Sequence, residues 1–195
     1  MLQALQNWIE STYQLEAESP VGDFLIDRPS LLRRLGSNHP LTRSEEVLLA
    51  ERRGTEWRLG LYLDAGKEPD NTHQIMTALE GVSHLRLLLH RIREEENLSH
   101  LELELQAEID KFLFFRLDGK SDEEAKLHLR RPSNLEGLDS VRRKTYESAR
   151  RLAYRYCLYL DGEYLSGNSH DRLYRELRRF YRLSHWQKLQ MLGPP

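Results

Sequence analysis

Two adjacent segments in the middle of the chain carry hydrophobic residues at the period of about 3.6 that is typical of helices. The first, residues 72–93, has apolar rows on two opposite sides, and the second, residues 99–115, repeats this arrangement. A helix with two apolar sides packs against neighbours on both. The turn around Asn97 is short, so the two helices are expected to lie antiparallel. Ser99 and Glu102 have the spacing of a capping box, which predicts where the second helix begins.

A change of period predicts a β-hairpin before the central helices. Apolar and polar residues alternate over residues 57–63, as in a strand with one buried face. Residues 47–52 make a weaker partner, and Gly54 between them suits the positive φ of a hairpin turn. A hairpin over residues 46–63 is therefore expected. Because two strands alone are marginally stable, they should pack on the helices or gain a third strand, for which residues 24–26 are the candidate.

Further helices are predicted on both sides of this region, where apolar residues return to helical spacing between glycine, proline and serine. They cover residues 1–16, 30–36, 121–129, 139–160, 173–180 and 184–192, with a break at residues 162–167. Residues 131–137 are the best candidate for an internal linker. The sequence predicts a predominantly helical α+β fold: a central antiparallel helical hairpin with a small N-terminal β-hairpin and basic C-terminal helices.

Charge is distributed unevenly along the 195 residues. The net charge of -2 combines 15 Lys and Arg against 24 Asp and Glu in residues 1–127 with 14 against 7 in residues 128–195. The basic C-terminal helices are expected to pack beside the acidic part, each screening the other. Length and a hydrophobic content of 39% suit one domain over residues 1–195, with a possible subdivision into an acidic part, 1–130, and a basic part, 131–195.

Cysteine content and hydropathy indicate the compartment. Cys157 is the single cysteine, so no intrachain disulfide and no cysteine zinc site can form, which favours a reducing environment. No stretch approaches the ~20 apolar residues of a membrane span, and residues 1–10 lack the basic and apolar regions of a signal peptide. A cytoplasmic protein without membrane attachment is expected.

Carboxylate and imidazole side chains lie along the two central helices. Glu80 and His84 are four residues apart in the first, and Glu104 and Glu108 are four apart in the second. Antiparallel packing can bring these groups together, and three carboxylates with one imidazole suit a divalent metal ion. The spacing departs from the Glu-x-x-His di-metal pattern, since Ser83 stands three residues after Glu80, and the His-Glu-x-x-His zinc pattern is absent. A metal site is one candidate.

A structural interpretation explains the same residues. Lys111 lies three residues after Glu108, so Lys111 and His84 can neutralise the carboxylates where two apolar faces meet. Buried charges must be paired, because an unpaired one costs several kcal/mol. We favour this structural polar network, with metal binding and proton-transfer chemistry as alternatives. Its members are Glu80, His84, Glu104, Glu108 and Lys111.

No motif with a catalytic mechanism is present. Gly119, Lys120 and Ser121 imitate the end of a phosphate-binding loop, but the required earlier glycine would fall at Phe114, and the segment follows a helix where a strand is needed. No Gly-x-Ser-x-Gly elbow, dinucleotide fingerprint or paired-cysteine motif occurs. The sequence therefore predicts no catalytic residue and no cofactor.

Arginines are interleaved with tyrosines in the C-terminal helices, on the side away from the predicted packing seam. Cations beside aromatic rings can hold phosphates and stack on bases, but the protein is slightly acidic and lacks a recognised nucleic-acid motif. An acidic protein partner or self-association is preferred, with nucleic acid as the alternative. The candidate binding residues are Arg142, Arg143, Arg150, Arg151, Arg175, Arg178 and Arg179.

Two segments resemble an uncharacterised bacterial protein family: residues 78–84 (Ala-Leu-Glu-Gly-Val-Ser-His) and residues 101–112 (Leu-Glu-Leu-Glu-Leu-Gln-Ala-Glu-Ile-Asp-Lys-Phe). The resemblance spans most of the chain, including residues 61–64 and 180–189. It implies bacterial origin and a compact single-chain fold. No activity is assigned to that family, so the resemblance adds nothing to the site argument.

Three functional hypotheses follow from these residues. The leading one is a cytoplasmic, non-catalytic interaction or adaptor protein, because no motif with catalytic mechanics is found. The second is a metal-dependent or acid/base enzyme with a Glu/His site between the central helices. The third is nucleic-acid binding through the arginine-rich helices. Bound metal or an open polar pocket favours the second, an uncovered basic face the third, and a large apolar patch a protein partner.

Overall fold

The computed structural model describes residues 1–17, 19–64, 72–117, 139–167 and 169–193. The predictions for residues 119–121, 121–129 and 131–137 lie outside the described residues. The α-helices are α1 (Leu2–Tyr13), α2 (Arg28–Leu35), α3 (Thr72–Arg93), α4 (His100–Leu117), α6 (Ser140–Leu160), α7 (His170–Arg182) and α8 (His185–Leu192). The strands are β1 (Glu46–Arg53) and β2 (Glu56–Leu63), and the short helical turns are η1 (Val21–Phe24), η2 (Pro40–Arg43) and η3 (Asp161–Leu165).

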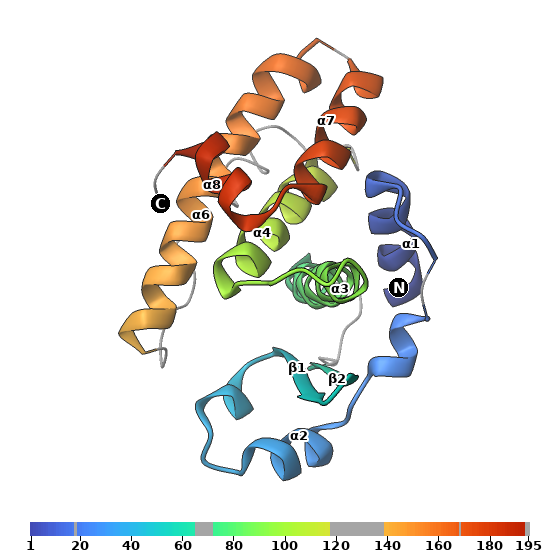
Figure 1. The fold of residues 1–195 in the computed structure, drawn as a ribbon, viewed down its shortest axis with the longest axis vertical. Helices are drawn as coiled ribbons and strands as arrows, with labels where there is room; N and C mark the ends of the chain where they lie inside the picture. Colours follow the sequence, from blue (N-terminus) through green and yellow to red (C-terminus); the bar gives the residue numbers. More distant parts are fainter. Residues whose placement is uncertain (18, 65–71, 118–138, 168, 194–195) are drawn as a thin grey trace.

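Helix α3 lies in the middle of the molecule, between α1, α4 and the β-hairpin (Figure 1). Its bounds are those predicted, and α4 begins at His100, within one residue of the predicted start. Leu79 and Leu88, on opposite sides of α3, are both buried, because the helix has neighbours on both faces. The predicted fold class, predominantly helical α+β with a central helical hairpin and a small N-terminal β-hairpin, is confirmed.

The two strands pair antiparallel over their whole length. Glu46 lies opposite Leu63, and Arg53 lies opposite Glu56 at the turn. Gly54 has φ 63° at the first position of this two-residue turn, a conformation that glycine adopts without strain. The predicted hairpin is therefore confirmed, and its short turn determines which residues share a face of the sheet.

A glycine in α3 allows the hairpin to approach the helix closely. A Cβ atom at Gly81 would lie 2.8 Å from Leu63 Cδ2 and 3.1 Å from Glu46 Cγ and Leu61 Cδ1. A larger side chain would therefore push the sheet away from α3. This close approach brings Glu46 beside His84, which follows Gly81 by about one helical turn.

The third strand proposed for residues 24–26 is not formed. The chain makes the 3-10 turn η1 up to Phe24, and only Leu25 bridges to Leu61, in parallel orientation. The amide of Ile26 donates to the carbonyl of Leu61 at 2.9 Å. The turn leaves too little extended chain for a strand, so the sheet has two strands in the part of the chain that the structure describes.

The C-terminal helices follow their predicted signals closely. The side chain of Asp139 accepts hydrogen bonds from the first turn of α6, and Ser184 and Gln187 form the capping box that opens α8. The break predicted at residues 162–167 begins later than expected, because α6 continues directly into η3, a π-helical turn. Helix α7 then starts at His170 and returns towards α1.

The main core lies between α1, α3, α4, α6 and α7, and a smaller one lies between the hairpin and α2. Fully buried side chains of the main core include Ile9, Leu79, Ile109, Leu152 and Leu173. Among the described helices, none has both the length and the apolar character needed to cross a membrane.

Candidate functional site

A groove of about 920 Å³ lies between the β-hairpin and the helices beside it. Leu48 and Trp57 line it from the sheet, Leu88 and Leu103 from α3 and α4, and Val141 from the start of α6. Trp57 is 38% exposed and Val141 is 72% exposed. The groove is therefore lined by apolar and polar side chains together, and no described segment of the chain covers Trp57 or Val141.

Three polar residues of the groove come together from different elements: His84 from α3, Glu104 from α4 and Glu46 from β1. Nδ1 of His84 lies 3.5 Å from Oε1 of Glu46, and Nε2 lies 3.8 Å from Oε2 of Glu104. Nε2 of His84 and Oε1 of Glu46 are buried without a hydrogen-bond partner among the described residues. With the neighbouring Glu80, we call these four residues the groove cluster.

A lysine and an arginine stand beside the groove cluster. Nζ of Lys111 lies 2.6 Å from Oε2 of Glu80 and 3.0 Å from Oε1 of Glu108. Nε of Arg150 lies 3.7 Å from the other oxygen of Glu108. All five residues of the predicted polar network thus lie close together, with Glu108 turned towards Arg150 and away from the groove lining.

The excess of carboxylates shifts the pKa values of the groove cluster. Burial alone lowers the pKa of His84, but Glu104, Glu46 and Glu80 outweigh it and raise the pKa to about 9. Burial raises the pKa of Glu104 to about 8; His84 opposes this shift, and Glu80 and Glu46 add to it. Burial and then Glu104 and Glu80 also raise the pKa of Tyr146, whose hydroxyl hydrogen bonds to Glu104. Acidic groups therefore outnumber basic ones in the groove cluster, and their mutual repulsion contributes to these shifts.

Sequence reasoning missed Glu46 and Tyr146. The signal for Glu46 was present, because a two-residue turn after Arg53 places Glu46 opposite Leu63, on the face that also carries Leu61. Tyr146 had no comparable signal, since the way α6 packs on α4 is a tertiary feature. One ligand atom each from Glu46, Glu80 and His84 lies within 4.8 Å of the others.

The C-terminal arginines divide into two groups. Arg143, Arg151 and Arg175 are exposed, and within the described ranges they have no acidic partner. The other candidates are engaged in contacts. Arg142 lies 3.7 Å from Asp139 and lines the groove, Arg150 faces Glu108, Arg178 donates to the carbonyl of Thr12, and Arg179 pairs with Glu176.

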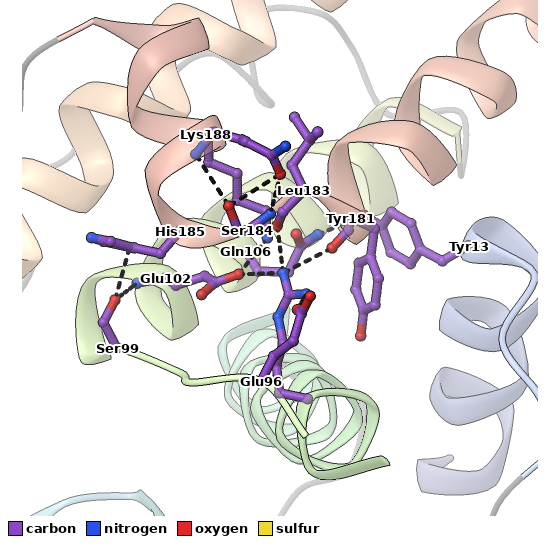
Figure 2. A network of polar contacts seen from close by, with 12 residues as sticks. Tyr13, Glu96, Ser99, Glu102, Gln106, Tyr181, Leu183, Ser184, His185 and Lys188 are labelled. Carbon is purple, nitrogen blue, oxygen red and sulfur yellow. Dashed lines mark hydrogen bonds and ion pairs between the residues drawn. The ribbon is translucent and has the colours of Figure 1, made fainter. Parts of the chain in front are cut away.

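A second ionic cluster lies at the other end of α3, where α4 and α8 meet; we call it the α8 network. Arg91 donates to Glu102 at 2.6 Å, and Lys188 of α8 donates to the same carboxylate oxygen at 2.7 Å. Figure 2 shows Glu102 and Lys188 converging from α4 and α8. Each of the three side chains is 1% exposed. Arg91 also pairs with Glu96 and donates to the carbonyl of Leu183 at 2.6 Å, which joins α3 to the end of α7.

The sequence predicted a capping box for Ser99 and Glu102, and it did not predict the α8 network. Ser99 accepts from the backbone N–H of Glu102 at 3.2 Å, as a capping box requires. The side chain of Glu102 does not complete the box, because it is used by Arg91 and Lys188. Burial lowers the pKa of Lys188 to about 8, with Arg91 contributing and Glu102 opposing. Nothing in the spacing along α8 indicated that Lys188 is buried.

Asp110 is a third buried carboxylate of α4; it forms no ion pair with a described residue, although the charge of Lys188 is near enough to lower its pKa slightly. Its oxygens accept hydrogen bonds from Tyr13, from Ser83 at 2.5 Å and from Gln106 at 3.0 Å. Burial raises its pKa to about 6, although the three hydrogen bonds oppose this shift. Tyr13 also stacks on Tyr181, so Asp110 joins α1, α3 and α4 next to the α8 network.

No protein-family model, curated protein or solved structure matches this chain. The bacterial origin implied by the resemblance of residues 78–84 and 101–112 therefore stays a prediction.

Proposed function

We propose that the protein is a non-catalytic interaction or adaptor protein of the cytoplasm, and that its groove holds an amphipathic segment of a protein partner. The observation that carries this proposal is the groove of about 920 Å³, whose lining combines exposed apolar side chains with charged ones. Exposed apolar surface that lines a concave site is typical of partner binding, and Trp57 and Val141 provide it here.

The rim of the groove supports a partner that is apolar on one side and charged on the other. Leu48 and Leu88 face the groove from its two walls. Arg52 and Arg142 line the groove, as do the acidic residues Glu95 and Glu96 of the α3–α4 turn. A helix with apolar residues at three- and four-residue spacing and charges of both signs beside them fits this arrangement.

The cytoplasmic assignment in this proposal rests on the single cysteine. Cys157 is fully buried in α6, and burial raises the pKa of its thiol. Such a thiol is an inert part of the core, which suits a reducing compartment.

Copurification from the cell that naturally makes the protein tests the proposal with two matched variants. Leu48→Glu puts a charge into the groove, whereas Leu158→Glu changes a residue of α6 that is 40% exposed and does not line the groove. We expect wild type and Leu158→Glu to retain a partner that Leu48→Glu loses. A photo-crosslinking amino acid at position 57 should join that partner through an amphipathic segment.

Two results would contradict this proposal. Equal retention of the partner by the two variants would show that the groove is not the binding surface. Crosslinking at position 57 to another copy of the same chain would assign the groove to self-association. Far-UV circular dichroism of both variants checks that the fold is intact.

Nucleic-acid binding is a second candidate, favoured by the exposed arginines that lack acidic partners in the described part of the chain. Arg151 lies on α6 and Arg175 on α7. If this function holds, generic RNA should bind at low salt, and Arg151→Glu with Arg175→Glu should remove most of the affinity. Absence of binding by wild type at low salt would eliminate it.

A further inference from the structure

The groove cluster contains nitrogen and oxygen atoms that could bind a metal ion and that form no hydrogen bond with a described residue. His84 is 4% exposed, yet its Nε2 has no hydrogen-bond partner among the described residues. Oε1 of Glu46 is in the same condition. A buried donor or acceptor without a partner costs about 1–3 kcal/mol, so two adjacent ones need an explanation. A metal ion that accepts an electron pair from each of the two atoms would be such an explanation.

The spacing of the donors suits a single ion. One nitrogen of His84 and one carboxylate oxygen each from Glu46 and Glu80 lie within 4.8 Å of one another. Ligand atoms about 2.0–2.2 Å from a common metal ion are about 3 Å apart, so small side-chain rotations are enough to close the site. Glu46 is a strand residue, and the other two come from α3.

The charges around the donors also suit a divalent cation. Four carboxylates gather here, Glu46, Glu80, Glu104 and Glu108, against the permanent cations Lys111 and Arg150. These four carboxyl groups outnumber the two permanent cations, and a divalent ion bound among them adds positive charge. Lys111 contacts Oε2 of Glu80 at 2.6 Å and so fixes the orientation of that carboxylate.

We propose that Glu46, Glu80 and His84 bind a divalent transition-metal ion such as Mn²⁺ or Zn²⁺ at the floor of the groove. One imidazole with two carboxylates favours these ions over Ca²⁺ and Mg²⁺, which prefer all-oxygen sites. Glu46 and His84 line the groove, so the remaining coordination positions face the groove. The ion joins the β-hairpin to α3, and its binding therefore stabilises the hairpin on the helix. This inference is independent of the proposed partner.

A titration with Mn²⁺ tests the site. The full chain is purified without a histidine tag, treated with a chelator and titrated with MnCl₂, and free Mn²⁺ is measured by its electron paramagnetic resonance signal. We expect the wild type to bind a single ion per chain and to unfold at a higher temperature with Mn²⁺ than without it. Ca²⁺ at the same concentration should give a smaller shift.

Variants locate the site within the chain. Glu46→Gln and His84→Gln should each weaken Mn²⁺ binding at least about tenfold and remove the Mn²⁺-dependent rise in unfolding temperature. Glu56→Gln changes an exposed carboxylate at the other end of the hairpin and should bind as wild type does. His84 is buried, so Glu46→Gln, whose side chain is 13% exposed, serves as the variant least prone to misfold.

Three results would overturn the proposal. The first is a wild type that does not remove Mn²⁺ from solution. The second is unchanged binding in folded Glu46→Gln protein, which would place the ion elsewhere. The third is an equal or larger stabilisation by Ca²⁺, which would contradict the assignment to a transition metal.

Discussion

The α8 network and the groove cluster both hold ionisable side chains in the interior beside α3 and α4, but they pair them differently. In the α8 network, Glu102 accepts hydrogen bonds from Arg91 at 2.6 Å and from Lys188 at 2.7 Å. In the groove cluster, His84 stands 3.5 Å from Glu46 and 3.8 Å from Glu104, both beyond good hydrogen-bond geometry. Arg91 and Glu96 of the α8 network also line the groove, but Glu102 and Lys188, which complete its ion pairs, do not; Glu46, His84 and Glu104 all line it.

These differences in contact distance and charge matching help to distinguish a structural ion pair from a candidate binding site. Arg91 and Lys188 are matched by Glu102 and Glu96 through direct ion pairs, although Nε of Arg91 and Oε2 of Glu102 have no hydrogen-bond partner among the described residues. The groove cluster has more carboxylates than cations and leaves space between the donors. Burial and perturbed pKa values occur in both, so neither feature identifies a site. The loose spacing and the excess of carboxylates beside an open groove are what support the site proposed at the groove cluster.

The largest expected effect comes from removing the charge of Glu102. Glu102→Gln leaves Arg91 and Lys188 buried without their shared carboxylate. Breaking a buried pair in this way costs about 3–5 kcal/mol. Urea denaturation followed by circular dichroism should show this loss of unfolding free energy, while Glu94→Gln, an exposed glutamate nearby, should change it by less than about 0.5 kcal/mol. A loss below about 1 kcal/mol for Glu102→Gln would show that the α8 network is not a structural ion pair.

Asp110 gives the second effect, which depends on pH. Its pKa of about 6 in the folded protein exceeds the usual value of 3.8, so the folded state binds this proton more tightly than the unfolded state. Protonated Asp110 therefore contributes about 3 kcal/mol to the free energy of unfolding below pH 4. This contribution is lost as the pH rises through 6.

The test compares unfolding free energies at several pH values between 4 and 7. Asp110→Asn should lose the part of the pH dependence that Asp110 causes, and Asp23→Asn, at an exposed carboxylate, should retain it. Identical pH profiles for wild type and Asp110→Asn would contradict the account. The expected loss of pH dependence sharpens the comparison, because Asp110 accepts hydrogen bonds but forms no ion pair with a described residue.

The third effect concerns the position of the hairpin. A side chain at Gly81 collides with Leu63, Glu46 and Leu61, so Gly81→Val should cost about 1–3 kcal/mol and move Glu46 away from His84. Gly162→Val is the control, because nothing lies within 4 Å of a Cβ atom there. Thermal unfolding should separate the two variants, and equal stabilities would show that close packing does not position the hairpin.

The smallest effect is expected in the groove cluster. Glu104→Gln is the same change as Glu102→Gln, two residues along α4, but no cation loses its only carboxylate, since His84 keeps Glu46. We expect a change of less than about 1 kcal/mol in the metal-free protein. Urea denaturation of the two variants side by side measures the contrast. A cost for Glu104→Gln as large as that for Glu102→Gln would remove the distinction between the clusters.

Periodicity was enough to predict most of the fold. The bounds of α3, the hairpin and the capping box at Ser184 follow from local patterns that the tertiary structure leaves unchanged. The prediction of a third strand was wrong, because the residues before Leu25 form the 3-10 turn η1. The helical conformation continues past the predicted break after α6, because Gly162 lies within a π-helical turn. A glycine in the sequence does not indicate whether the chain forms such a turn or ends the helix.

The site was predictable only where it lies on the central helices. Four- and three-residue spacings place Glu80, His84 and Lys111 on facing sides of α3 and α4. Glu46 reaches them through the packing of a sheet on a helix, and Lys188 reaches Glu102 through the docking of α8. Contacts between distant elements depend on the angles at which those elements pack, and hydrophobic patterns in one sequence do not determine these angles.

Anomalous X-ray scattering from crystals grown with MnCl₂ tests the central claim most directly, namely that the groove cluster is a site and the α8 network is a structural ion pair. The account predicts a manganese peak between Glu46, Glu80 and His84, with the contacts of Glu102 to Arg91 and Lys188 unchanged. A map without a peak at these three residues, or with its strongest peak elsewhere on the chain, would contradict it.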